Sequence, residues 1–254
     1  NKLNKWFLVN RLSLNVDKTC YMVFTPHRKD CNSNFKLLIG DNEIKRVKSC
    51  RYLGLIIDDE LKWSEHINTI YSYLLKYVGI FYKLRNRVVP AGVMKNVYYA
   101  FVHSHILYGI ELYANTFPTY IDKLVKLNNK ILRILLHQSR FCSVRDLYTC
   151  FNTLPVPELH KYQLLLLVHN TMYHSKLLPD VFANYFTLNS SVHAYLTRSH
   201  SDIHIYRANT SFGQRSVSYK AGILWNSLPS GLKIIHSSLQ FKSTLLQLYQ
   251  TVFC

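Results

Sequence analysis

Two adjacent aspartates, Asp58 and Asp59, are the most obvious candidates for catalysis in this sequence. Paired carboxylates can hold the metal ions that a two-metal polymerase uses for phosphoryl transfer. Here, however, Glu60-Leu61-Lys62-Trp63 follows directly and leads into a helix predicted to begin at Ser64. Acidic residues just before a helix commonly compensate the helix dipole. We therefore expect these aspartates to support a helix start rather than a reaction.

A zinc site is the second kind of chemistry that the residue types allow. Cys142, Cys150, His137 and His160 could supply four ligands. None of the six cysteines has CxxC spacing, however, and the eight-residue gap between Cys142 and Cys150 lies in predicted helix, which favours ordinary thiols. The cysteines also form no compact disulfide framework, so we expect a reducing, intracellular compartment and no metal site in this chain.

Other catalytic motifs are missing from the sequence. It contains no GxSxG element, no HExxH motif and no glycine-rich loop that could hold a phosphate. Eight glycines in 254 residues leave little material for a nucleotide-binding loop. The sequence therefore predicts a chain that carries no complete catalytic centre.

Charge is the strongest functional signal. Lys and Arg number 31 against 14 Asp and Glu, which gives a net charge of +17 and a pI near 9.6. An excess of this size favours polyanions, because binding releases their condensed counterions. Nothing resembles a signal peptide or an apolar stretch of ~18 residues that could span a membrane. We expect a nucleic-acid partner and no membrane, with a merely basic soluble protein as the alternative.

The elements that would position these residues fall into a short β region and a long α region. A helix over 2–12 precedes a β region over 14–58, with strands expected at 21–24, 35–39, 43–47 and 51–57, a loop at 27–34 and a hairpin turn at 40–42. Periodicity and caps then predict helices at 64–87 and 93–108, one capped by Thr119, and others at 143–151, 158–174, 220–228 and 238–252. A polar loop is expected at 177–214. The fold class is α+β, mostly α.

The helix after Thr119 separates apolar from basic residues. Leu124, Leu127, Ile131, Ile134 and Leu135 form its predicted buried face. The opposite face carries a basic row of Lys123, Lys126, Lys130 and Arg133. Such a row can follow the phosphates of a nucleic acid, although a solvated helix face would have the same pattern.

Motifs in a fixed order extend over nearly the whole chain. They are Trp6-Phe7, Asn10, Leu12–Asn15, Lys18-Thr19, Arg51–Asp58, Leu61, Trp63, His66-Ile67, Leu84-Arg85, Tyr98, Leu107–Gly109, Ile131–Arg133, Thr197-Arg198, Arg207, Trp225–Pro229 and Phe241-Lys242. Together they resemble the C-terminal portion of the reverse transcriptases of non-LTR (LINE, jockey-like) retrotransposons. No chemical role follows for Trp225–Pro229 from the residues alone, and a helix end closing at Pro229 is the structural interpretation.

The resemblance implies a domain order and several residue roles. It implies a partial polymerase palm with antiparallel primer-grip strands over 1–62, a helical thumb bundle over 63–140 and a C-terminal helical region over 141–254. Lys18 would be a general acid for the leaving pyrophosphate, or otherwise a surface lysine beside a turn. Tyr52, Leu53 and Gly54 would form the primer grip, where glycine allows close backbone approach or marks a strand bend.

The resemblance also implies the partners. Thumb residues would contact the backbone of an RNA–DNA primer–template duplex, namely Lys76, Lys83, Arg85, Arg87, Lys123, Lys126, Lys130 and Arg133. The paired catalytic aspartates of the family would precede residue 1, in an upstream palm and fingers segment of the same polyprotein. We therefore expect Mg²⁺ to be bound there and no cofactor in this chain.

Two alternatives remain open. The chain could be a stand-alone nucleic-acid-binding protein derived from such an element, or a decayed fragment without function. Exposed apolar surface where palm strands should pack would favour a polymerase portion or a decayed fragment. A fully polar surface around residues 14–58 would favour the stand-alone protein.

Overall fold

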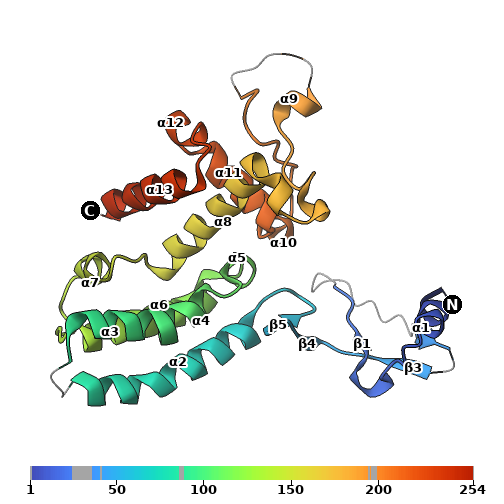
Figure 1. Cartoon of the computed structure of the whole chain (residues 1–254), viewed down its shortest axis with the longest axis horizontal. Coiled ribbons are helices and arrows are strands. Elements are labelled where there is room, and N and C mark those ends of the chain that lie inside the picture. The colour runs from blue at the N-terminus through green and yellow to red at the C-terminus, as the bar shows by residue number, and fades with distance from the viewer. Residues whose placement is uncertain are drawn as a thin grey trace. The chain divides into compact units, whose positions relative to one another are not determined.

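The computed structural model describes residues 2–24, 36–40, 42–85, 89–193, 195 and 199–253. Contacts divide the chain into two units, unit 1 over residues 1–66 and unit 2 over residues 67–254 (Figure 1). Short strands occur in unit 1, and helices make up most of the rest. The predicted fold class, α+β and mostly α, agrees with this content.

Unit 1 begins with helix α1 (Lys2–Val9) and the 3₁₀ turn η1 (Val16–Lys18). A three-stranded sheet follows in the order β1-β3-β2, formed by β1 (Cys20–Tyr21), β2 (Leu37–Ile39) and β3 (Asn42–Arg46). The predicted hairpin is present, since β2 and β3 pair antiparallel. By contrast, β1 pairs parallel with β3, and the antiparallel prediction is wrong for this pair. A parallel pair needs a long connection, which local sequence patterns do not reveal. The predicted loop at 27–34 lies outside the described residues.

A second sheet is a two-stranded hairpin of β4 (Ser49–Tyr52) and β5 (Leu55–Asp58). Tyr52 pairs with Leu55, so the turn holds only Leu53 and Gly54, with φ of 46° and 85°. Positive φ at both turn residues gives the twist that a two-residue hairpin requires. The single strand predicted over 51–57 is therefore wrong, because the chain reverses at Leu53-Gly54.

Unit 2 is helical over most of the part that the structure describes, and α2 begins in unit 1 and continues into it. Its longer helices are α2 (Ser64–Arg85), α3 (Ala91–Tyr98), α6 (Pro118–Leu135), α7 (Val144–Phe151), α8 (Val156–Tyr173), α11 (Val217–Asn226) and α13 (Ser238–Phe253). Its shorter turns are η2 (Tyr99–His103), α4 (Ser104–Leu107), α5 (Ile110–Tyr113), η3 (Ser175–Leu177), η4 (Asp180–Phe182), α9 (Asn189–Val192), α10 (Ser211–Gln214) and α12 (Ser230–Lys233).

The predicted apolar faces of α2 and α6 are buried, except that Tyr71 is half-buried. In α2 the buried stripe consists of Ile67, Ile70, Leu74, Val78 and Phe81, and in α6 of Leu124, Leu127, Ile131, Ile134 and Leu135. The predicted Thr119 cap is wrong, since α6 begins at Pro118 with Phe117 as its N-cap. Proline suits the first helical position, where its missing N–H needs no partner.

A buried asparagine joins three of these helices. The Tyr98 hydroxyl of α3 donates to Asn128 Oδ1 of α6 at 3.2 Å, and Asn128 Nδ2 donates to the Tyr148 hydroxyl of α7 at 3.0 Å. All three residues are almost fully buried. Buried polar groups are costly unless paired, so this network favours one arrangement of the three helices.

The helix predicted over 93–108 runs from Ala91 to Leu107 and ends before Gly109, whose φ is 67°. Its centre, η2, is a π-helix. Five buried residues on this segment and on α5 follow one another at intervals of four, namely Met94, Tyr98, Val102, Ile106 and Ile110. An α-helix has 3.6 residues per turn, so a spacing of four drifts around its axis. The wider π turn offsets part of that drift.

A second core lies among α8, α11 and α13. Its buried members are Leu164, Leu165, Val168, Phe186, Ile203, Ala221, Trp225, Leu232, Phe241 and Leu245. The ring of His169 stacks on Phe241 at 4.2 Å and its Nε2 lies 2.7 Å from the Ile235 carbonyl.

The segment predicted as a polar loop over 177–214 is anchored to this core. Leu188 and Ile203 form an isolated antiparallel bridge, and Ile203 is 2% exposed. The Asn226 side chain accepts from the Ile203 N–H and donates to the Ile203 carbonyl, both at 2.9 Å. The motif Trp225–Pro229 thus has a structural role, because Trp225 fills the core and Asn226 holds the segment, while α11 ends before Pro229 as interpreted.

Candidate nucleic-acid interface

The residues expected to form a primer grip lie at the tip of the β4–β5 hairpin. Tyr52 is 62% and Leu53 73% exposed, and Gly54 is exposed as well. A leucine at positive φ is strained relative to glycine or asparagine. The sequence therefore places an apolar side chain in open solvent at a position that suits neither its polarity nor its backbone preference.

The base of the hairpin is fixed by Asp58. Its carboxylate accepts from the backbone N–H groups of Glu60, Lys62 and Trp63, at 3.2, 2.8 and 2.6 Å. Both oxygens are used just before α2 begins, which fits the expected helix-supporting role. Among the described residues, no group of three or more His, Cys, Asp or Glu side chains could hold a metal ion.

His66 connects the hairpin to the first turn of α2. Its Nδ1 accepts from the Ile56 N–H at 3.3 Å, and the ring is 5% exposed. Burial lowers the pKa of His66, and the charge of Arg51 lowers it further. A neutral imidazole can accept this bond through Nδ1, so His66 is a structural residue here.

Lys18, the proposed general acid, is exposed in η1. Its backbone N–H donates to the Asn15 Oδ1 at 3.1 Å. This bond positions the turn and leaves the ammonium group on the surface, and the catalytic role remains a prediction.

The basic residues expected on α2 differ in exposure. Lys76 and Lys83 are exposed, whereas Arg85 is half-buried. Arg87 lies outside the described residues. The Lys76 ammonium lies 5.3 Å from the centre of the Tyr73 ring, within the range of a cation–π contact.

The basic row on α6 is weaker than the sequence predicts. Lys123 is hydrogen-bonded to Asn68 of α2, and Lys126 forms an ion pair with Asp122 at 2.5 Å. Arg133 is half-buried and its Nη2 donates to the Cys142 carbonyl at 3.3 Å, so part of its guanidinium is engaged within the chain. Its position near the edge of the apolar face lets the long stem bury beside the core. Lys130 remains exposed.

A ring cluster on unit 2 consists of residues that the sequence analysis did not single out. Tyr73 stacks on His105 with ring centres 5.9 Å apart and planes 4° apart. Tyr77 lies 6.3 Å from His105 and 5.5 Å from Phe101. Tyr73 and Phe101 are 42% and 46% exposed. These four residues, Tyr73, Tyr77, Phe101 and His105, join two helical segments into an exposed aromatic surface.

The i,i+4 spacing of Tyr73 with Tyr77 and of Phe101 with His105 was the available signal. Such pairs share one helix face. Which two faces meet, however, depends on tertiary packing, so each pair by itself was equally consistent with a core.

Among the helices that the structure describes, none combines the length and the apolar character needed to cross a membrane.

Cys20, Cys50, Cys142 and Cys150 are free thiols.

Comparison with known proteins gives a distant relationship. The chain is 24% identical over 146 residues to the RNA-directed DNA polymerase from the mobile element jockey of Drosophila funebris. The match covers 56% of this chain and 16% of that polymerase, so the chain spans a small part of the relative. No family model and no solved structure matches. The similarity supports a relationship to the reverse transcriptases of non-LTR retrotransposons, and suggests a fragment of such an element.

Proposed function

We propose that this chain is the palm-end, thumb and C-terminal portion of a non-LTR reverse transcriptase and grips the RNA–DNA primer–template duplex. In this proposal the metal-binding aspartates that transfer the nucleotide belong to palm sequence outside this chain. The distant similarity to the jockey polymerase and the net charge of +17 support the proposal.

The ring cluster with Lys76 is the observation that carries the proposal. Aromatic side chains stack on nucleic-acid bases without regard to sequence, and nearby cations hold the backbone. Lys83 continues the cationic surface along α2. We assign the ring cluster to an unpaired base at the edge of the duplex, and Lys76, Lys83 and Lys130 to phosphates.

Exposed apolar surface on unit 1 favours a polymerase portion over a stand-alone binding protein. Phe24 and Leu38 are 52% and 53% exposed, and α1 has no buried residue. Apolar surface of this kind commonly marks a place where other protein packs. We assign it to the palm and fingers of the same polyprotein.

The buried Asn128 network favours a chain that folds over a decayed fragment. Its donors and acceptors are matched across α3, α6 and α7. Drifting sequence loses such agreement quickly, because a single substitution leaves a buried polar group unpaired. Within this proposal Lys18 stays the candidate general acid and the β4–β5 tip the primer grip.

Binding of the purified chain to a labelled RNA–DNA primer–template across a salt series tests the proposal. We expect the affinity to fall steeply with salt, because phosphate contacts release counterions. The double variant Lys76→Glu/Lys83→Glu should reduce the salt slope by about 1.8, the value for two lost phosphate contacts on a duplex. The control Lys176→Glu/Lys242→Glu changes net charge equally at exposed positions elsewhere in unit 2. Equal losses in both variants would exclude a defined binding face.

Stacking is tested separately from charge. Phe101→Ser should weaken binding about tenfold, since one base stacked on an aromatic ring is worth roughly 1–3 kcal/mol. Phe141→Ser is the matched control, because Phe141 is 82% exposed outside the ring cluster. A ring cluster without a role in binding would leave Phe101→Ser at the affinity of the control.

Primer extension with Mg²⁺ tests whether this chain lacks a catalytic centre, as the proposal expects. We expect no extension by this chain alone. Extension that disappears in the Asp59→Ala variant would contradict the proposal and make Asp59 a catalytic residue.

A further inference from the structure

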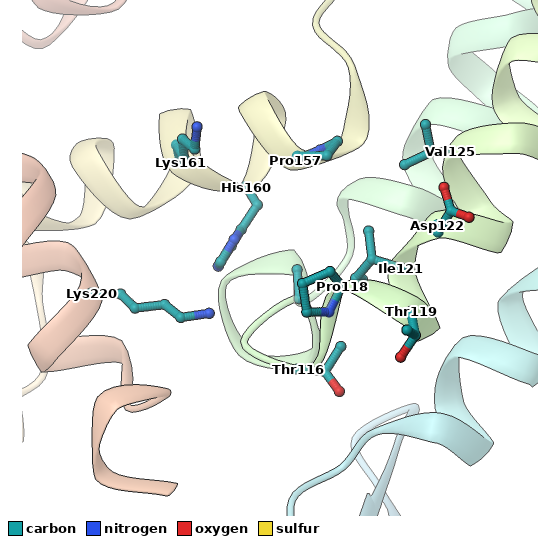
Figure 2. Close-up of a pocket in the computed structure, with 11 residues that line it drawn as sticks. Thr116, Pro118, Thr119, Ile121, Asp122, Val125, Pro157, His160, Lys161 and Lys220 are labelled. Atoms are coloured by element: carbon teal, nitrogen blue, oxygen red, sulfur yellow. The ribbon is translucent and has the colours of Figure 1, made fainter. Parts of the chain in front are cut away.

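A cavity of about 630 Å³ in unit 2 opens between the first turn of α6, the first turn of α8 and the helix α11 (Figure 2). Pro118, Ile121, Val125 and Pro157 provide apolar walls. The volume lies within the range of small-molecule sites, which are mostly apolar with a few convergent polar groups. Here the polar lining includes three basic residues, His160, Lys161 and Lys220, beside Thr116, Thr119 and Asp122, and none of the roles proposed above uses the basic ones.

His160 is the most buried titratable residue of the cavity lining. The residue is 7% exposed, and its Nε2 has no hydrogen-bond partner among the described residues. Figure 2 shows the ring pointing into the cavity toward the end of the Lys220 side chain. An unpaired buried polar atom is costly, so a native protein that retains one calls for a partner such as a water or a bound ligand.

Arg215, next to the cavity wall, also has a buried polar atom without a hydrogen-bond partner among the described residues. Its guanidinium lies over the Phe117 ring at 4.2 Å, directly before the wall residue Pro118. Its Nε donates to the Ser211 carbonyl at 3.2 Å, whereas its Nη1 is buried without a partner among the described residues. The stacked ring holds the guanidinium plane in one orientation, which leaves the Nη1 donor preorganised.

At the Lys220 end of the cavity, positive charge is not balanced by an acidic partner among the described residues. Lys161 pairs with Glu158 at 3.0 Å, and Asp122 pairs with Lys126. Lys220 forms no ion pair in the part of the chain that the structure describes. Burial lowers the pKa of Lys220, and the charge of Arg215 lowers it further. Burial, Lys220 and Lys161 together lower the pKa of His160 to about 3.

Lys220 and Arg215 repel each other, and His160 Nε2 and Arg215 Nη1 have no hydrogen-bond partner among the described residues, so a nearby anion would relieve the repulsion and could pair with His160. We propose that the cavity binds a small organic anion, with its phosphate or carboxylate group on Lys220 and His160, the charge of Arg215 nearby, and an apolar body against Pro118 and Pro157. With Nε2 protonated, the neutral His160 ring donates to the anion beside the Lys220 ammonium. This site is independent of the duplex-binding surface proposed above, so each can fail without the other.

Calorimetric titration of the whole chain with phenyl phosphate tests the site. We expect saturable binding at least tenfold tighter than that of inorganic phosphate, because the ring adds apolar burial. Benzoate binding at similar affinity would identify a carboxylate site, and weaker benzoate binding a phosphate site; both support an organic-anion cavity. Benzyl alcohol binding as tightly as phenyl phosphate would overturn the proposal, since the cations would then contribute nothing.

Variants locate the site. Lys220→Met should weaken phenyl phosphate binding at least tenfold, because a charged hydrogen bond is lost. Lys242→Met, on the exposed face of α13, should keep wild-type affinity. Val125→Trp fills the apolar end without touching the cations and should also abolish binding. Circular dichroism melting of each variant verifies folding, and wild-type affinity in both Lys220→Met and Val125→Trp would overturn the proposal.

Discussion

The two units of the chain differ most in what they do with their apolar side chains. In unit 2, long stripes on α2, α6, α8 and α13 are buried, and residues such as Leu74, Ile131 and Phe241 are completely inaccessible. In the described part of unit 1, Trp6 is 55% exposed and α1 buries no residue. Unit 2 therefore buries its apolar side chains in its own core, whereas unit 1 leaves large apolar side chains exposed.

The difference shows that hydrophobic content does not by itself define an independent core. Both units contain apolar helices and strands, but only a helix whose neighbours lie in the same unit can bury its stripe. Strands pair in twos and threes in unit 1, and such small sheets are rarely stable without a covering layer. The predictions below test this contrast, from the largest effect to the smallest.

A tryptophan pair gives the sharpest contrast. Trp225→Ala should lower the free energy of unfolding by about 3–5 kcal/mol, because the 2%-exposed ring leaves a cavity in the second core. Trp6→Ala in unit 1 should cost less than about 0.5 kcal/mol. Guanidinium denaturation followed by circular dichroism measures both. Similar losses would show that α1 has a core of its own after all.

An asparagine pair makes the same comparison for polar groups. Asn128→Ala removes the acceptor of the Tyr98 hydroxyl and one of two partners of Tyr148, which still donates to Asn129 at 2.7 Å, and should cost about 2 kcal/mol in urea denaturation. Asn10→Ala removes only an exposed bond from Asn10 to the Trp6 carbonyl, and stability should change little. An Asn128→Ala protein as stable as the wild type would mean that the network does not fix the helices.

Acidification should weaken unit 2 through His160. Its pKa is about 3 in the folded chain and 6.5 in the reference state, so the unfolded chain binds the proton more readily. Stability is thus retained above pH 6.5 and lost progressively as the pH falls toward 3. Between pH 7 and pH 5 we expect a loss of about 1–2 kcal/mol from this residue. His66 and His169, whose pKa values are also lowered, act in the same direction.

His160→Gln removes this titration and should flatten the pH dependence of the melting temperature. An unchanged pH dependence in His160→Gln would assign the effect to other histidines.

The aspartate pair tests the base of the hairpin in unit 1. Asp58→Ala should cost about 1 kcal/mol, because three backbone N–H groups lose their acceptor at the start of α2. Asp59→Ala should leave the free energy of unfolding nearly unchanged. Thermal denaturation of both variants measures the difference. The reverse order of effects would remove the structural role that Asp58 has here.

A substitution at the hairpin tip should have the smallest effect on the free energy of unfolding. Unlike the variants above, it should stabilise the chain. Leu53→Asn should stabilise by about 0.5 kcal/mol, because asparagine tolerates the positive φ of this turn. If the tip is a primer grip, the same variant should weaken primer–template binding. Stabilisation without any change in binding would separate the tip from the proposed function.

Periodic helices could be predicted from the sequence, because the buried residues of each helix recur at helical spacing within that one segment. The faces of α2 and α6 and the end of the third helical segment before Gly109 were of this kind. The turn at Leu53-Gly54 could not, since leucine is an unusual residue for positive φ. The inward position of Arg133 and the pairing of β1 with β3 depend on distant segments.

The candidate site was predictable only in part. Lys76 and Lys83 were named from the resemblance, and both are exposed, while their contact with phosphates stays a prediction. Neither the ring cluster nor the cavity was visible, because the residues that meet there come from separate helices. His160 was considered only as a zinc ligand, since nothing in the sequence places it near Lys220.

The π turn η2 has a consequence for how this region can accept insertions and deletions. The buried residues on both sides of it, from Met94 to Ile110, stay near one face in part because one turn is wider. A π turn holds about one residue more than an α turn, so deletion of one residue between Tyr99 and His103 would leave a uniform α-helix and keep the residues after it on their present faces. Ile106 would stay in the core and His105 in the ring cluster, whereas a one-residue deletion elsewhere in this helix would rotate everything after it by roughly 100°, so homologous chains should lose a residue here more readily than elsewhere in the helix.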